Sequence, residues 1–136
     1  IRRPPRSTLL PYTTLFRSLV VKDSKILLLG FTFKENCPDI RNTKVVDVYH
    51  TLLEYTHDIV VCDPWADAKL VKAEYGIALS DASFSDLQCS FDAVIVSVAH
   101  RQFMELDVRS FLKNTQKGVV YDVKGFCDRN QVDGRL

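Results

Sequence analysis

The sequence predicts an α/β domain, a Rossmann-like three-layer fold around a mostly parallel sheet. Short and uninterrupted apolar runs recur along the chain, a pattern typical of strands that are buried on both faces. Segments with apolar residues at helical spacing separate these runs, and this alternation indicates a parallel sheet covered by helices. The chain has 136 residues, 46% of them hydrophobic, which is enough for one domain with a substantial core.

The first predicted strand covers residues 25–29, and a loop connects it to a helix predicted at 43–55. One face of that helix is apolar, and it carries Val45, Val48, Tyr49, Leu52 and Leu53. A second strand, at 58–62, ends at Asp63-Pro64, because proline has no N–H to donate to a sheet ladder. These three elements form a β-α-β unit.

The alternation continues through the second half of the chain. The predicted elements are a charged helix at 66–74, a short apolar patch at 76–79, a short helix at 83–87, a strand at 91–99 and a last strand at 118–123. A further helix is predicted behind the strand at 91–99 from a run of apolar residues, namely Phe103, Met104, Leu106, Val108, Phe111 and Leu112.

Residues 1–18 differ from the rest in composition. They contain three prolines, five serines or threonines and four arginines, but no acidic residue. An arginine-rich, acid-free start is also what a transit peptide shows, yet the stretch resembles translated sequencing-adapter read-through. We therefore interpret residues 1–18 as a non-native or disordered segment, expect the natural protein to begin upstream, and assign residues 19–136 to the domain.

Charge and cysteine spacing exclude several kinds of partner. After residue 18 the chain has 14 basic and 17 acidic residues, so no general positive field favours nucleic acid. The four cysteines are widely separated and show no metal-ligand spacing, which predicts that no metal is bound. No apolar run approaches the roughly 20 residues that a membrane span needs. We expect a cytoplasmic protein, because nothing marks the start as a secretory signal.

The loop between the first strand and the first helix has the residues of a ligand site. Ligands of open α/β sheets settle at the carboxyl ends of the strands, where helix N-termini also point. This loop, residues 30–43, carries the cations Lys34 and Arg41 and the aromatic rings of Phe31 and Phe33. A capping residue, Asn42 or Thr43, marks the start of the helix. Together these groups suit a phosphorylated ligand with a flat base or a sugar.

The same loop carries a family resemblance. Its sequence G-F-T-F-K-E-N-C-P-D-I-R-N-T-K resembles the signature of the C-terminal domain of the UDP-glucose/GDP-mannose dehydrogenase family. Further matches are Asp63-Pro64, the Val-Ala-His segment at 98–100, Tyr-Asp-Val-Lys-Gly at 121–125 and the terminal Asp-Gly-Arg-Leu. The segment E-N-C-P-D-I-R-N-T is most similar to the sequences of members that oxidise UDP-N-acetylhexosamines, including the Vi-antigen type.

The resemblance implies a function for the whole enzyme. Such enzymes oxidise the sugar C6 alcohol to a carboxylate in two NAD-dependent steps, through a cysteine-bound thiohemiacetal and thioester. It also implies that residues 19–136 are the domain that closes over the UDP-N-acetylhexosamine, for surface polysaccharide synthesis. The NAD-binding domain and the catalytic cysteine belong to other parts, so this chain alone is expected to be inactive. The complete enzyme is expected to form a homodimer or a larger assembly.

The resemblance also assigns roles to individual residues. Phe33, Lys34 and Lys124 match positions in the nucleotide-sugar site, and Arg41 matches an arginine that reaches the nicotinamide cofactor across the domain interface. By spacing alone, Lys34 would more often be a solvated loop lysine, and the resemblance reverses that preference. Arg41 could simply pair with Asp39, although a cation at a helix N-terminus opposes the helix dipole.

Three other reactive residues are predicted to be structural. His100 follows a strand and could act as an acid or base near pH 7, but a buried structural histidine is the preferred interpretation. Asp63 lies where a dinucleotide fold has its ribose-binding acid, yet Gly30 stands alone where G-x-G-x-x-G would be needed. Cys37 could be a reactive thiolate in a cationic loop and is interpreted as non-catalytic. No catalytic residue is therefore predicted in this chain.

A non-enzymatic α/β module that binds a nucleotide or CoA and has a regulatory role is the competing function. Periodicity alone allows it equally well. The sequence upstream of Leu19 distinguishes the two, because a dehydrogenase requires a G-x-G-x-x-G turn and a cysteine-bearing helical segment there.

Overall fold

The computed structural model describes residues 24–135, so the segment 1–18 lies outside the described range. The regular elements within this range alternate between strands and helices as predicted. In chain order they are β1 (Ile26–Leu29), α2 (Val45–Leu53), β2 (Ile59–Cys62), α3 (Ala68–Tyr75), the 3₁₀ turn η1 (Ser85–Leu87), β3 (Ala93–Val96), α4 (Arg101–Met104), the 3₁₀ turn η2 (Val108–Phe111), β4 (Val119–Asp122), the 3₁₀ turn η3 (Arg129–Gln131) and β5 (Gly134–Arg135).

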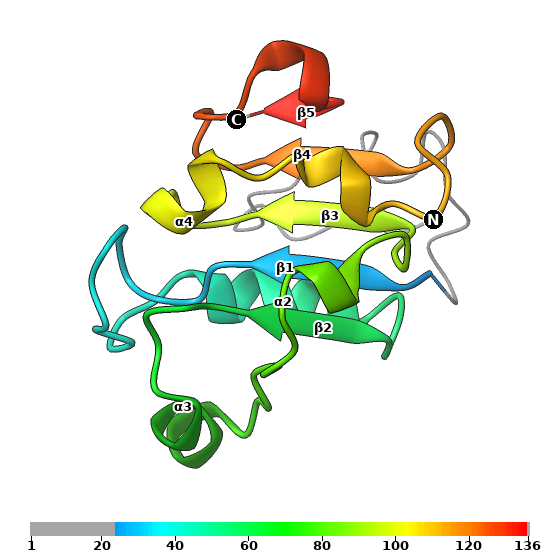
Figure 1. The fold of residues 1–136 in the computed structure, drawn as a ribbon. Coiled ribbons are helices and arrows are strands. Elements are labelled where there is room, and N and C mark those ends of the chain that lie inside the picture. Colours follow the sequence, from blue (N-terminus) through cyan, green and yellow to red (C-terminus); the bar gives the residue numbers. More distant parts are fainter. Residues whose placement is uncertain (1–23, 136) are drawn as a thin grey trace.

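The strands form one parallel sheet in the order β2-β1-β3-β4-β5. All its arrowheads therefore point to one end, which we call the carboxyl end of the sheet (Figure 1). The chain leaves β1 toward β2 on one side and reaches β3 on the other side. The strand order thus reverses between β1 and β3, and open α/β sheets bind ligands outside such a reversal.

Helices cover both faces of the sheet, which confirms the three-layer prediction. Helix α2 lies behind the sheet and α4 in front of it (Figure 1). The core behind the sheet includes Ile26, Leu28, Val45, Val48, Leu52, Ile95 and Tyr121. The core in front includes Leu27, Leu29, Val94, Val96, Phe103, Phe111 and Val120. Because both faces are buried, each strand is apolar throughout and does not alternate with polar residues.

Gly30 sets the close approach of the segments that follow β1 and β3. Its φ angle is +100°, which side-chain-bearing residues rarely adopt. A Cβ atom at this position would lie 2.7 Å from Val98 Cβ and 2.8 Å from the Val98 amide nitrogen. Glycine therefore lets the two segments pass in contact at the point where the strand order reverses.

The prediction of one continuous helix after β3, made from the apolar residues between Phe103 and Leu112, is wrong. The chain forms α4 and then η2 instead, and Asp107 lies between them. The Asp107 carboxylate accepts a hydrogen bond from the Arg109 amide at the start of η2. This local bond competes with helix continuation. Met104, predicted to pack in the core, is 60% exposed.

Two smaller differences concern the ends of elements. Helix α2 begins at Val45 with Lys44 in the capping position, not Asn42 or Thr43. The Thr43 hydroxyl still accepts from the Val45 amide over 3.2 Å, so the predicted residue supports the helix start from one position further out. The short strand β5 was not predicted, because two residues leave no periodic pattern.

Candidate functional site

The β1–α2 loop (residues 30–44) extends past the carboxyl end of β1 (Figure 1). A hydrogen bond of 2.7 Å from the Phe33 amide to the Asp39 carbonyl closes its central part. Thr43 fastens the far end, because its hydroxyl donates over 2.6 Å to the main-chain carbonyl at position 31. The loop therefore has a defined shape, on which Lys34 and the half-exposed Phe33 face solvent.

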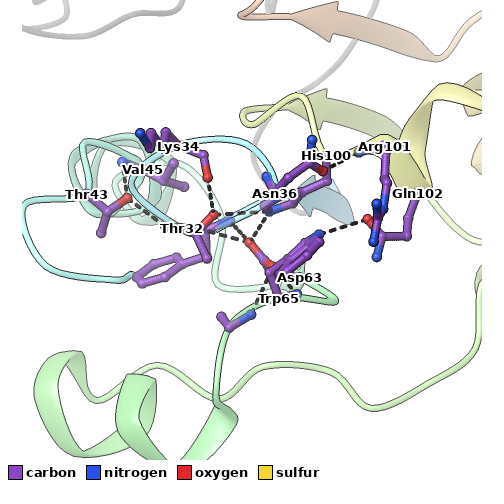
Figure 2. Close-up of polar contacts among 12 residues, drawn as sticks. Thr32, Lys34, Asn36, Thr43, Val45, Asp63, Trp65, His100, Arg101 and Gln102 are labelled. Carbon is purple, nitrogen blue, oxygen red and sulfur yellow. Dashed lines mark hydrogen bonds and ion pairs between the residues drawn. The ribbon is translucent and has the colours of Figure 1, made fainter. Parts of the chain in front are cut away.

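The Asp63 carboxylate anchors this loop from below (Figure 2). Its Oδ2 atom accepts from the amides of Phe31 at 2.6 Å and Thr32 at 3.0 Å, and lies 2.9 Å from His100 Nε2. Its Oδ1 atom accepts from the amides two and three residues further on, at 2.7 and 3.1 Å. Five donors thus surround the carboxylate, whose capacity is about four acceptor sites. Asp63 organises a turn, as predicted, and has no free oxygen for a ribose.

Asp63 is ionised in the folded state despite its burial. Burial is the largest single influence on this carboxyl and raises its pKa, but the hydrogen bonds from His100 and from the loop amides together outweigh burial. The pKa of Asp63 therefore lies below its ordinary value. Burial, with the Asp63 charge next to it, raises the pKa of the Cys62 thiol to about 11, so Cys62 is a protonated core residue at neutral pH.

We predict an acid-dependent loss of stability from Asp63. A carboxyl whose pKa is lowered by folding stabilises the protein above its unfolded pKa, about 3.9, and this contribution is lost as pH falls through the folded pKa. The free energy of unfolding should therefore fall more steeply below about pH 4 in the wild-type chain than in Asp63→Asn. Urea titrations followed by circular dichroism at several pH values measure both slopes. Equal slopes would contradict the prediction.

His100 occupies the space between Asp63 and the β1–α2 loop. The residue is completely buried just after β3. Its Nε2 atom lies 2.9 Å from Asp63 Oδ2 and 3.1 Å from Thr32 Oγ1, and its Nδ1 atom lies 2.9 Å from the Asn36 amide. Both ring nitrogens therefore have partners within the fold. This geometry agrees with the structural role that was predicted for His100.

A second set of contacts joins the loops that follow β2 and β3. The Trp65 indole N–H donates to Gln102 Oε1 over 2.9 Å, and the Arg101 guanidinium lies 5.4 Å from the Trp65 ring centroid. The Asn36 side chain accepts from the Arg101 amide over 2.8 Å. The loops after β1, β2 and β3 are thereby connected into one rigid surface at the carboxyl end of the sheet (Figure 2).

Lys124 lies on a turn with the same construction, residues 123–127 after β4. The carboxylate of Asp122, fully buried at the end of β4, accepts from the amides of Lys124 at 3.1 Å and Gly125 at 2.9 Å, and from that of Cys127 at 2.7 Å. The main chain of Lys124 is thus held in place, while its side chain is exposed.

Phe33, Lys34 and Lys124 all lie at the carboxyl end of the sheet. Strand β3 separates β1 from β4, and adjacent strands are about 4.8 Å apart, so the two lysine-bearing loops leave the sheet about 10 Å apart. Within residues 24–135 neither lysine ammonium forms an ion pair or a side-chain hydrogen bond. Two unpaired cations on loops at the same end of the sheet, with an exposed aromatic ring, are groups that can bind an extended anion.

Arg41 is paired in this structure. Its Nε and Nη2 atoms donate to the two carboxylate oxygens of Asp39 over 3.0 and 3.2 Å, while the side chain remains 85% exposed. The side-chain hydrogen bond between the two groups, followed by the Asp39 charge, raises the pKa of Arg41, and the same hydrogen bond lowers the pKa of Asp39. A cation at the N-terminus of a helix would oppose the helix dipole. Arg41 does not occupy that position, because α2 begins four residues later, at Val45.

The part of the chain that the structure describes lacks a metal cluster, a membrane-spanning helix and a dinucleotide fingerprint. No cluster of histidine, cysteine, aspartate or glutamate side chains there could hold a metal ion. No helix in that part is long and apolar enough to cross a membrane. The described residues also do not fit a dinucleotide on their own, since Asp63 has its oxygens occupied and Gly30 is not followed by a glycine-rich turn.

Sequence reasoning missed the connections between the functional loops. Asp63 and His100 were each assigned a structural role, but their mutual contact and their joint support of the β1–α2 loop were not foreseen. Asn36 and Asp122 were not singled out at all. A usable signal existed, because aspartates directly after parallel strands end up beside the loops of neighbouring strands.

Comparison with known proteins gives matches over nearly the whole chain. A family model described as "UDP-glucose/GDP-mannose dehydrogenase family, UDP binding domain" matches residues 27–129. A UDP-N-acetyl-D-glucosamine 6-dehydrogenase from Salmonella typhi is 44% identical over 124 residues, which are 88% of this chain and 28% of that protein. One from Pseudomonas aeruginosa is 39% identical over 121 residues, again 88% of this chain and 28% of the relative.

Solved structures with a similar fold include two archaeal dehydrogenases. The NDP-N-acetyl-D-galactosaminuronic acid dehydrogenase of Methanosarcina mazei aligns with a TM-score of 0.73 and 21% identity, over 90% of this chain and 26% of that one. A UDP-glucose dehydrogenase from Pyrobaculum islandicum aligns with a TM-score of 0.70 and 24% identity, over 90% of this chain and 27% of that one. The present chain thus spans little more than a quarter of the length of these proteins.

Proposed function

The chain belongs to the UDP-glucose/GDP-mannose dehydrogenase family and matches its C-terminal, UDP-binding domain, and from this premise we propose that it binds the nucleotide-sugar substrate of a 6-dehydrogenase. The substrate is a UDP-N-acetylhexosamine, since the two relatives described above bear the name UDP-N-acetyl-D-glucosamine 6-dehydrogenase. Family membership favours this function over a regulatory module that binds CoA.

One observation carries the proposal. Lys34 and Lys124 are exposed, unpaired cations on two rigid turns that leave the same end of the sheet. A diphosphate bound between them would accept charge-assisted hydrogen bonds, and one such bond contributes about 1.5–3 kcal/mol. Phe33 beside Lys34 offers a flat apolar surface on which a uracil ring or a sugar face can lie.

The residues then have distinct roles in binding. Lys34 and Lys124 hold the diphosphate, and Phe33 covers the base or the sugar. Arg41 exchanges its Asp39 partner for the cofactor bound by another domain of the enzyme. The planar guanidinium of Arg41 can donate two hydrogen bonds to a phosphate of that cofactor, just as it donates two to the Asp39 carboxylate.

The chemistry takes place between this domain and the rest of the enzyme. NAD, when bound elsewhere in the enzyme, accepts the hydride in each of the two oxidation steps from alcohol to carboxylate. The family resemblance assigns the cysteine that forms the covalent intermediates to a central segment outside this chain. Of the four cysteines here, Cys62 and Cys127 are buried, and we assign no catalytic role to Cys37 or Cys89. This chain supplies substrate orientation and exclusion of water. We place the complete enzyme in the cytoplasm, in surface polysaccharide synthesis, as a dimer or larger assembly.

A domain exchange tests the proposed function. Residues 19–136 replace the corresponding domain of the Salmonella typhi relative, and NADH formation is followed with UDP-N-acetylglucosamine and with UDP-N-acetylgalactosamine. We expect the hybrid to oxidise at least one of them, while the 136-residue chain alone makes no NADH. The relative without its last domain serves as the control for background turnover. A folded hybrid that binds neither nucleotide sugar would overturn the proposal.

A further inference from the structure

The β1–α2 loop is held by hydrogen bonds on both sides of its exposed stretch, residues 33–35. On one side the Thr32 hydroxyl donates to the Lys34 carbonyl over 3.0 Å. On the other side the Asn36 amide donates to His100 Nδ1 over 2.9 Å. The Thr32 hydroxyl is itself 3.1 Å from His100 Nε2. The buried His100 ring therefore contacts the loop before Lys34, through the Thr32 hydroxyl, and after it, at the Asn36 amide.

These contacts determine which ring nitrogen of His100 carries the proton. The Asn36 amide can only donate, so Nδ1 must present its lone pair. The proton then lies on Nε2, where Asp63 Oδ2 accepts it at 2.9 Å. The Thr32 hydroxyl uses its own proton for the Lys34 carbonyl and has lone pairs left for the same N–H. The neutral Nε2–H tautomer satisfies every contact at once.

Asn36 adopts a left-handed backbone conformation, which asparagine enters more readily than most other non-glycine residues. Its φ angle is +55°, in the left-handed region that non-glycine residues rarely occupy. Two contacts hold it there, the amide bond to His100 and the side-chain bond to the Arg101 amide at 2.8 Å. These two contacts therefore fix the main chain at the point where the exposed stretch of the loop ends.

We propose that His100 is a positioning residue for nucleotide-sugar binding: its Nδ1 lone pair fixes Asn36 and thereby holds Lys34 and Phe33 in the conformation that receives UDP. This inference rests on the proposed function. His100 touches no substrate and acts only through the loop. Its action is distinct from its packing against Phe103, 5.4 Å away in an edge-to-face arrangement, which contributes to the core alone.

Two conservative variants separate the contacts of the ring. His100→Gln places an amide near Nε2, where it can still donate to Asp63, but leaves the Asn36 amide without an acceptor. His100→Asn places an oxygen near Nδ1, where it can accept from the Asn36 amide, but no longer reaches Asp63. We expect His100→Gln to weaken UDP binding by about 3- to 10-fold, the effect of one hydrogen bond. We expect His100→Asn to restore most of that affinity.

A double-mutant cycle with Lys34→Ala gives the decisive comparison. UDP is titrated into the 136-residue chain and its variants and followed by NMR. A residue that acts through Lys34 should weaken binding in the wild-type background and have little effect in the Lys34→Ala background. An equal factor in both backgrounds indicates a general structural role and overturns the inference while the proposed function stands. No loss of affinity in Lys34→Ala itself overturns the inference together with the assignment of Lys34 to the site, whereas the proposed function is tested by the domain exchange.

The wild-type chain provides a test that does not depend on folding of the variants. The ¹⁵N shifts of the His100 ring should show an unprotonated Nδ1 and a protonated Nε2 at neutral pH. A proton on Nδ1 would exclude the bond from the Asn36 amide and with it the positioning role.

Discussion

Replacing Asp63 with alanine is expected to lower the free energy of unfolding by about 3–5 kcal/mol, because several buried donors lose their acceptor at once. The substitution removes the acceptor of four backbone amides and of His100. Each buried donor left without a partner costs about 1–3 kcal/mol, reduced where water can enter the space. The effect should be large because Asp63 is the common partner of three loops.

Urea unfolding followed by circular dichroism measures this loss. Asp63→Asn is the isosteric comparison, and it should be intermediate because its amide oxygen still accepts while its nitrogen faces other donors. Asp67→Ala is the matched control, since Asp67 is an exposed aspartate that caps α3 through two amides. We expect about 0.5–2 kcal/mol for that cap. A loss at Asp63 no larger than at Asp67 would contradict the account of the anchor.

Lys34→Ala is expected to weaken the affinity for UDP by roughly 10- to 150-fold, which corresponds to a charge-assisted contact worth about 1.5–3 kcal/mol. The ammonium has no partner in the described fold, so its removal should leave stability nearly unchanged. Lys124→Ala should act in the same direction, because Lys124 lies on the neighbouring turn at the same end of the sheet. Calorimetric titration with UDP, in the chain and in the domain-exchange hybrid, measures both effects.

Lys117→Ala is the control for the lysine variants. Lys117 is also exposed, but it precedes β4 and therefore lies at the opposite end of the sheet. Its replacement changes the net charge equally and should leave UDP affinity unchanged. Equal weakening by all three substitutions would indicate a general charge effect, and unchanged affinity in both Lys34→Ala and Lys124→Ala would refute the site assignment.

The fold could be predicted because its signals are local and repeated. Runs such as Ile26–Leu29 and Ala93–Val96 are apolar at every position, and only a sheet covered on both faces buries them completely. The helix behind β3 could not be predicted correctly from its apolar residues. There Asp107 accepts a local hydrogen bond from the Arg109 amide at the start of η2, a contact that no periodicity reveals.

The exposed residues of the candidate site could be named from the sequence, but the buried contacts that hold its loops could not. Lys34 and Lys124 could be named because charged residues after parallel strands gather at one end of a sheet, and the family resemblance assigned them a ligand. The β1–α2 loop amides that donate to Asp63, and the side-chain partners of His100, lie more than 30 residues away along the chain. Such contacts depend on strand order and register, which the sequence pattern of a parallel sheet leaves open.

Mapping UDP on the ¹⁵N-labelled chain by NMR tests the central claim most directly, because it locates the ligand and tolerates weak binding. We predict that the amide shifts caused by UDP cluster in two segments, the β1–α2 loop and residues 123–127, and that Lys34→Ala reduces them. Shifts confined to the opposite end of the sheet or to α3, or no shifts at saturating UDP, would contradict the claim that the carboxyl end of this sheet binds the nucleotide sugar.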